Sequence, residues 1–216
     1  MWPFTKPTWK NLIHKLALSA VDELTDQGEL ELAARNSRAF EVRIAAVEKI
    51  TNQKALADIA INGDNGYVAW KALSKLSDME ALINIARFTI HDSVGEKAVS
   101  RLEEQKAFAD VVRKATNACS RYWALSKLTD QELLYDCATD TSVSGYARIS
   151  AADKLDDRKN AMEIYNYFFN DEESPYRPMA CTRIHDGHYF KEGFCTRCGT
   201  EDDEPDNPSG YNGWGW

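Results

Sequence analysis

Val42–Gln53 reads VRIAAVEKITNQ, and the chain contains five further close variants of this stretch. In each copy a charged residue, which we call the anchor, precedes Leu or Ile. Successive anchors are 26 residues apart, except for a last interval of 27. A constant period of this length is typical of stacked repeat arrays, in which each unit contacts its neighbours instead of one shared core. The six anchors are Glu23, Lys49, Lys75, Arg101, Lys127 and Lys154.

Each copy has the apolar spacing of a helix. The residue three before the anchor is always Ala, and the residues two before and one after it are apolar. Because positions three and four apart share one helical face, these residues form a single apolar stripe. A small residue at a fixed site predicts close approach of neighbouring helix backbones. The six alanines are Ala20, Ala46, Ala72, Ala98, Ala124 and Ala151.

A second helix follows each anchor after a short polar joint. Residues seven, ten and eleven after the anchor are apolar in nearly every unit, as in Leu56, Ile59 and Ala60. Joint residues of the Ser, Thr and Asp type predict N-caps, and Ser77 with Glu80 and Thr129 with Glu132 fit a capping box. The joint Glu103-Glu104 lacks such a residue, so we expect weaker capping there. The sequence predicts an all-helical array.

The chain divides into four segments. Residues 1–15, which are rich in aromatic residues, are expected to cap the first repeat, and residues 16–175 to form the array. Residues 176–200 hold three of the five cysteines, and residues 201–216 form an acidic segment with the composition of a flexible tail. That tail holds five carboxylates and no basic residue. Of the net charge of −8, the first 200 residues therefore carry only −3, which disfavours nucleic acid as a partner.

Other classes are disfavoured by what the sequence lacks. It contains no apolar run long enough to span a bilayer and no signal peptide, so no membrane association is expected. Five cysteines, an odd number, fit a reducing cytoplasm better than a disulfide framework. We find no phosphate-binding loop, no HExxH and no G-x-S-x-G motif, and we expect no enzymatic activity. An enzyme site assembled between the array and the cysteine-rich segment is a remaining alternative.

The cysteine-rich segment has the spacing of a metal site. Cys195-x-x-Cys198-Gly199 is typical of a metal-binding turn, and Cys181 with one histidine completes four ligands for tetrahedral Zn²⁺. The alternative is unbound thiols beside surface histidines. An iron–sulfur cluster fits less well, because it usually takes four thiolates. A closed set of four ligands predicts a structural zinc.

This pattern resembles the Cys…His-x-aromatic…Cys-x-x-Cys-Gly zinc modules at the ends of some bacterial proteins. The resemblance implies His188 as the histidine ligand, because Phe190 then supplies the aromatic residue. His185 is the alternative ligand.

Basic residues occupy five of the six anchors, and these are candidate binding residues: Lys49, Lys75, Arg101, Lys127 and Lys154. Stacking would align them into a positive ladder suited to an anionic partner such as nucleic acid. The alternative interpretation is that cations near helix C-termini complement the helix dipole. Trp70 and Trp123, with nearby tyrosines, are expected to pack between repeats, and the alternative is an exposed aromatic stripe.

The repeated motif V-R-x-A-A-V-x-K-[LI]-T-[DN]-Q, followed by L-x-x-[IA]-A, resembles the bacterial HEAT-like and leucine-rich-repeat-variant families. The resemblance covers about three quarters of the chain. It implies a right-handed α-solenoid of about six 26-residue two-helix repeats, with a curved face that binds a protein. We therefore expect a non-enzymatic scaffold for protein–protein interaction, with a zinc knuckle near its C-terminus. The alternative function is a nucleic-acid-binding or nucleic-acid-processing HEAT-like protein.

Overall fold

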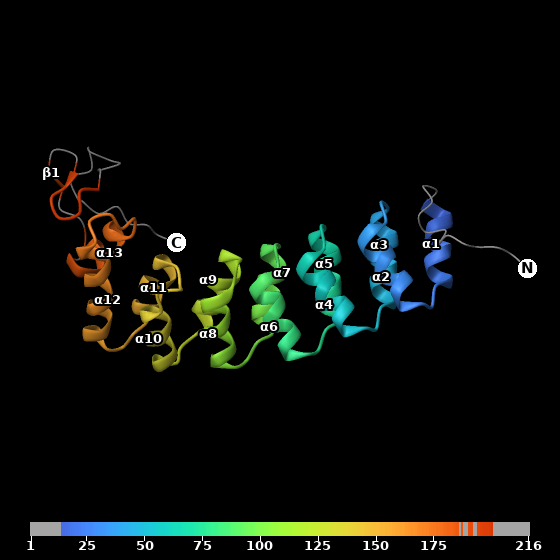
Figure 1. The fold of residues 1–216 in the computed structure, drawn as a ribbon, viewed down its shortest axis with the longest axis horizontal. Helices are drawn as coiled ribbons and strands as arrows, with labels where there is room; N and C mark the ends of the chain where they lie inside the picture. The colour runs from blue at the N-terminus through green and yellow to red at the C-terminus, as the bar shows by residue number, and fades with distance from the viewer. Residues whose placement is uncertain (1–13, 186, 188–189, 192–193, 201–216) are drawn as a thin grey trace, which may run out of the picture. The chain divides into compact units, whose positions relative to one another are not determined.

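The structure is a computed structural model, and it describes residues 14–185, 187, 190–191 and 194–200 (Figure 1). The predicted N-terminal cap lies outside these residues except for the first two of helix α1, and the acidic tail lies wholly outside them. The chain packs as two compact units, Met1–Ala124 and Leu125–Trp216. The fold is helical, with two strands of two residues each among the described residues.

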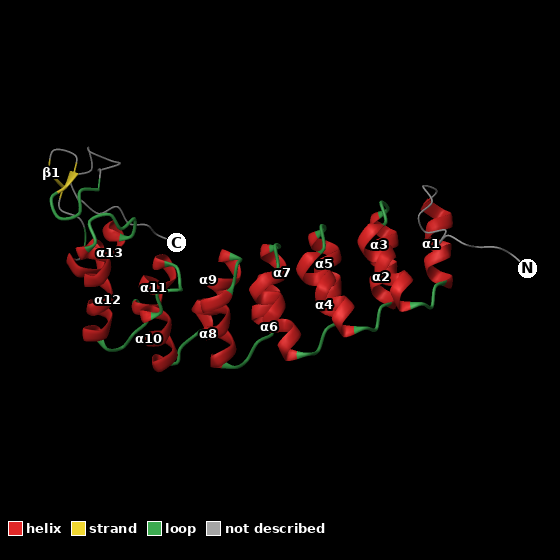
Figure 2. Ribbon diagram, viewed as in Figure 1, coloured by secondary structure: helices red, strands yellow, loops and turns green. Residues whose placement is uncertain are grey.

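The first unit contains two rows of short helices that alternate along the chain, joined by short loops (Figure 2). Most helices contact the next helix in their row, and the second helices of the first three repeats also pack against the first helix of the following repeat. The first-helix row is α1 (His14–Glu23), α3 (Phe40–Lys49), α5 (Gly66–Ser74), α7 (Asp92–Ser100) and α9 (Ala118–Lys127), which crosses the boundary between the units. The second-helix row is α2 (Gln27–Asn36), α4 (Gln53–Asn62), α6 (Met79–Phe88) and α8 (Gln105–Lys114).

The second unit continues the helical pattern and then departs from it. Helix α10 (Gln131–Thr139) packs on α11 (Gly145–Ala152), and both contact α12 (Arg158–Asn170). Helix α13 (Arg177–His185) packs on α12 and leads to an antiparallel pair, β1 (Phe190–Lys191) and β2 (Phe194–Cys195). The predicted repeat array is thus present as stacked helix pairs within each unit.

The predicted alanine seam is buried. Five of the six alanines are fully inaccessible to solvent: Ala46, Ala72, Ala98, Ala124 and Ala151. Ala20, in the first described helix, is partly exposed. The apolar positions of the second helices are buried as well, including Leu56, Ile59 and Ala60. The helical periodicity therefore identified the core, because the same face of each helix is repeatedly turned toward its neighbours.

The helix caps differ from the predicted capping boxes by one residue. Asp78 and Asp130, not Ser77 and Thr129, are the N-caps, and their carboxylates accept hydrogen bonds from the backbone N–H groups of Ala81 and Leu133. Asp is as good an N-cap as Ser, so the helix begins one residue later at no cost. The weak joint is confirmed, because Glu104 is an N-cap without a side-chain hydrogen bond.

Within the described ranges, none of the helices combines the length and the apolar character that crossing a bilayer requires.

Candidate functional site

Three cysteines predicted to bind metal come together near the C-terminus. Cys181 lies on α13, Cys195 ends β2, and Cys198 lies in the turn that follows. Their Sγ atoms all lie within 4.8 Å of one another, and the Sγ atoms of Cys181 and Cys195 are 4.0 Å apart. All three side chains are buried, and the ring of Phe169 packs against them. The sequence pattern thus located a real cluster.

The turn between Cys195 and Thr200 carries two of the three cysteines, and backbone hydrogen bonds close it. The N–H of Gly199 donates to the carbonyl oxygen of Cys195 at 2.8 Å, and the N–H of Cys195 donates to that of Thr200 at 2.8 Å. Gly199 has a φ of 77°, which is the left-handed region that glycine enters without strain. Open space surrounds the position that a Cβ would occupy, so backbone conformation is the reason for glycine here.

The cluster has the donors and spacing of a tetrahedral thiolate site. Two thiolates of one zinc ion, each about 2.3 Å from the metal, lie roughly 3.8 Å apart, close to the separation of Cys181 and Cys195. Burial, and then the neighbouring cysteines, raise the pKa of the Cys181 thiol to about 12. Without a metal, the Cys181 thiol is therefore protonated at neutral pH. A bound cation would reverse this preference, because a coordinating thiol loses its proton.

Of the two candidate histidine ligands, the structure describes one, His185. His188, implied by the resemblance, lies outside the described residues. His185, the alternative, ends α13, where its ring meets that of Phe169 edge-on with centroids 5.4 Å apart. Among the described His, Cys, Asp and Glu side chains, the group that fits a metal consists of the three cysteines and does not include His185.

The basic anchors bind backbone carbonyl groups of the preceding repeat. The ammonium of Lys75 donates to the carbonyl oxygens of Val47 and Ile50 at 3.0 and 2.7 Å, and also to that of Glu48. Lys154 binds three equivalent carbonyl groups at the end of α9, and Lys49 and Arg101 bind two each at the ends of α1 and α5. Carbonyl groups at a helix end have few backbone donors within reach, and some of these share their oxygen with the N–H three residues further along, as Val47 does with Ile50. Each of the four cations thus caps the first helix of the preceding repeat.

Two details fit this capping role. Burial lowers the pKa of Lys75 and of Lys154, since both ammonium groups are partly withdrawn from water. Glu23, the acidic anchor, is in the first described helix, which has no described helix before it to cap. Lys127, the remaining candidate, is exposed at the end of α9.

A second set of polar residues links repeats and was missed by sequence reasoning. The side-chain amide of Gln27 donates to the carbonyl oxygen of Lys49 at 3.4 Å and accepts from the N–H of Thr51 at 2.8 Å. Gln131 makes the same pair of contacts with Lys154 and Asp156 in the second unit. Glutamine recurs four residues after the anchor in four repeats, and that recurrence was the available signal.

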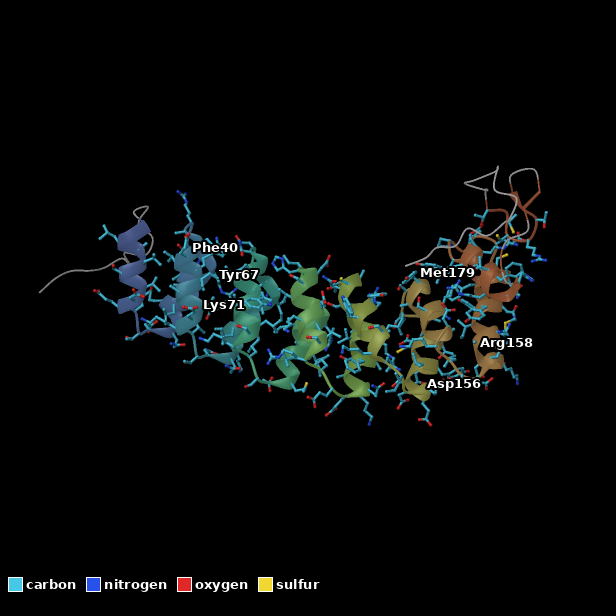
Figure 3. The ribbon with its side chains drawn as sticks, turned by 180° about the vertical axis from the view of Figure 1, so that it is seen from behind. Phe40, Tyr67, Lys71, Asp156, Arg158 and Met179 are labelled. Atoms are coloured by element: carbon cyan, nitrogen blue, oxygen red, sulfur yellow. The ribbon has the colours of Figure 1, made fainter. Side chains whose placement is uncertain are left out.

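The tyrosines and one tryptophan predicted to pack between repeats are instead on the surface. Phe40 on α3 and Tyr67 and Trp70 on α5, which we call the aromatic cluster, are 40%, 54% and 38% exposed. The Tyr67 ring centroid lies 5.5 Å from that of Phe40 and 5.6 Å from that of Trp70. Figure 3 labels Phe40 and Tyr67 on these neighbouring helices. Tyr122 and Tyr146 are also exposed, whereas the alanines of the first helices are buried.

Comparisons with models of protein families, with curated proteins and with solved structures return no match to this chain. What stands is a protein of repeated helices with a cluster of three cysteines near its C-terminus.

Proposed function

We propose that this chain is a HEAT-like, right-handed repeat scaffold of the cytoplasm that binds a protein partner. Its C-terminal segment holds a structural zinc ion through Cys181, Cys195, Cys198 and His188, and the chain itself catalyses no reaction. None of the five cysteines forms a disulfide in the structure, which supports the assignment to a reducing compartment. The partner is a protein segment with apolar side chains and little net charge.

The aromatic cluster is the observation that carries the proposal. Three adjoining, partly exposed rings form an apolar surface on a rigid pair of helices, and exposed aromatic groups of this kind are typical of protein-binding sites. Aromatic side chains supply much contact area at a small cost in conformational entropy.

The charges beside the cluster determine the chemistry of the partner. Arg43 on α3 pairs with Asp64 in the loop before α5, and Lys71 on α5 pairs with Glu48 on α3 at 2.8 Å. Glu48 in turn raises the pKa of Lys71, which remains charged. Because each of these two cations is paired with a carboxylate, the two pairs add little net charge beside the cluster. An uncharged apolar segment complements such a surface.

The hydrogen bonds of the basic anchors argue against the nucleic-acid alternative. Binding to a phosphate backbone requires cations that are free to replace counterions. Four of the five basic anchors are hydrogen-bonded to carbonyl groups, so the predicted positive ladder is a set of helix caps. Stacking of bases on the aromatic cluster would still require a positive groove beside it.

A displayed library of random peptides tests the proposal, with the full chain as bait. We expect enrichment of peptides with apolar side chains and little net charge. Combined substitution Phe40→Ala, Tyr67→Ala and Trp70→Ala should weaken binding of these peptides ten- to a hundredfold or more, since each ring truncation at a binding hot spot costs more than about 1 kcal/mol. The control combines Phe88→Ala and Tyr122→Ala, two exposed aromatic residues outside the cluster, and should bind as the wild type does.

Two outcomes would contradict the proposal. The first is equal peptide binding by the wild type and the triple variant. The second is the absence of enriched peptides together with binding to fluorescently labelled single-stranded or duplex DNA that weakens as salt rises, which would establish the nucleic-acid alternative.

A further inference from the structure

Arg177 connects three parts of the metal-binding segment. Its Nε donates to the carbonyl oxygen of Phe169 at 3.0 Å, near the end of α12. Its two terminal nitrogens reach the turn that carries two of the thiols. One lies 3.2 Å from the carbonyl oxygen of Arg197 and the other 3.5 Å from that of Cys198. The guanidinium also lies over the Phe169 ring, 5.4 Å from its centroid.

The position of Arg177 on α13 brings it to the same side as the Cys181 thiol. The two residues are four apart, so they lie one turn apart on one face of the helix. From this face Cys181 supplies one thiol, while Arg177 holds the backbone of the turn that supplies the other two. Phe169 completes the arrangement, because its carbonyl group accepts from Arg177 and its ring packs on the three cysteines.

We propose that Arg177 is a positioning residue for the metal, which presents the Cys195–Cys198 turn to Cys181 before the ion binds. The inference rests on the proposed metal site. Three carbonyl acceptors in different directions match the planar fork of a guanidinium, which a lysine ammonium on a flexible stem cannot reproduce. When the fork holds the turn in place, less conformational entropy is lost on metal binding, and the affinity for metal rises.

The chain offers a matched control on the same helix. Arg183 also lies on α13 and ties it to the rest of the unit, through two hydrogen bonds to the carboxylate of Asp153 at 2.9 and 3.0 Å. Among the described residues, the hydrogen bonds of the Arg183 side chain go to Asp153 and Thr182 and not to the Cys195–Cys198 turn. Loss of Arg183 therefore removes a contact of α13 but leaves the Cys195–Cys198 turn held by Arg177. Loss of Arg177 removes a contact of α13 and also releases the turn.

Metal binding by the full chain tests the inference. Zn²⁺ affinity is measured by competition with a chromophoric chelator, and the ligand set by the absorption spectrum of the Co²⁺-substituted protein. We expect one metal per chain in the wild type and in Arg177→Ala, with the same Co²⁺ spectrum. The Arg177→Ala dissociation constant should be about ten- to a hundredfold higher, as is usual for groups that orient metal ligands. Arg183→Ala should bind zinc within about threefold of the wild type, since it retains these orienting groups.

The outcomes separate this inference from the proposed site. A wild-type chain that binds no Zn²⁺ or Co²⁺ overturns the metal site and the inference together. One metal per chain with equal affinities for the wild type and Arg177→Ala overturns the inference alone, as does an equal loss in Arg183→Ala. The variant Arg177→Lys keeps the positive charge and the fold but lacks the fork. A Zn²⁺ affinity of Arg177→Lys equal to that of the wild type would show that the positive charge, and not the shape of the guanidinium, raises the metal affinity, and would overturn the inference.

Discussion

The alanine three residues before the anchor places a small side chain in the buried face of the first helix. Five of these six side chains have no solvent-accessible surface. A larger residue would meet atoms of the adjacent repeat, and a close-packed interior does not yield without strain. Gly95 illustrates the same limit on α7, because an added Cβ would overlap the hydroxyl of Ser120 on α9. Small residues thus determine how closely the repeats stack.

The substitution Ala46→Leu tests this limit. We expect it to lower the free energy of unfolding by about 1–3 kcal/mol, because the extra carbons overpack a site that has no free space. Urea denaturation followed by circular dichroism measures the change. The matched control is Ala45→Leu, the neighbouring residue on α3, which is partly exposed and should change stability by about 0.5 kcal/mol or less. Equal effects at both positions would contradict a close-packed seam.

At the scale of the element, each short helix is completed by the repeat that follows it. Helices of about ten residues are marginal on their own, and the carbonyl groups of their last turns lack partners. Anchor cations supply donors at one end of the first helices. At the end of the second helices, Thr89 donates to the carbonyl oxygen of Ala60 at 3.1 Å and His91 lies 2.7 Å from that of Gly63. Stacking therefore supplies hydrogen bonds as well as apolar burial.

We expect Lys75→Met to destabilise the chain by about 1–2 kcal/mol. Methionine keeps a stem of similar length but loses the donor to three carbonyl groups at the end of α3, which water then satisfies only in part. Thermal and urea unfolding report the change. Lys71→Met, on the same helix, removes only an exposed pair with Glu48 and should have little effect. A Lys75→Met variant as stable as Lys71→Met would show that the capping bonds contribute nothing.

At the scale of the whole molecule, the chain packs as two compact units, each of which contains stacked helix pairs. The candidate metal site belongs to the second unit, on a segment whose described residues form α13 and two strands of two residues. So small a segment cannot bury enough apolar surface to be stable by itself. A metal that joins α13 to the Cys195–Cys198 turn would supply the missing stability.

Removal of metal should therefore affect one part of the chain. We expect a chelator to increase hydrogen exchange at the amides of α13 by about tenfold or more, since binding energy at a structural zinc is folding energy. Amides of α3 to α7 should keep their protection. Exchange followed by mass spectrometry on the intact chain measures both.

The variant Cys195→Ser provides the control. It should show the fast exchange of α13 without chelator, and chelator should add nothing further. Protection of α13 that is the same with and without chelator in the wild type would contradict a structural metal.

Much of the site was predictable because its chemistry depends on local spacing. Cys195 and Cys198 are close in the chain, and their distance from Cys181 is short enough for the pattern to stand out. The roles of Arg177 and Gln27 were not predictable. Both bind backbone carbonyl groups of residues about 20 positions away. Every residue has such a group, so residue types do not identify the partner. The function of the anchors was uncertain for the same reason.

The sequence by itself determined the helical class, the period and the buried face of every repeat, because these follow from which side chains are apolar and how they are spaced. It also determined the candidate metal ligands, since thiol chemistry is specific to a residue type. Only the tertiary structure decided that the basic anchors cap the preceding repeat and that the aromatic cluster faces solvent. Both depend on which backbone or side chain lies opposite across a repeat boundary, and that is a property of packing between segments.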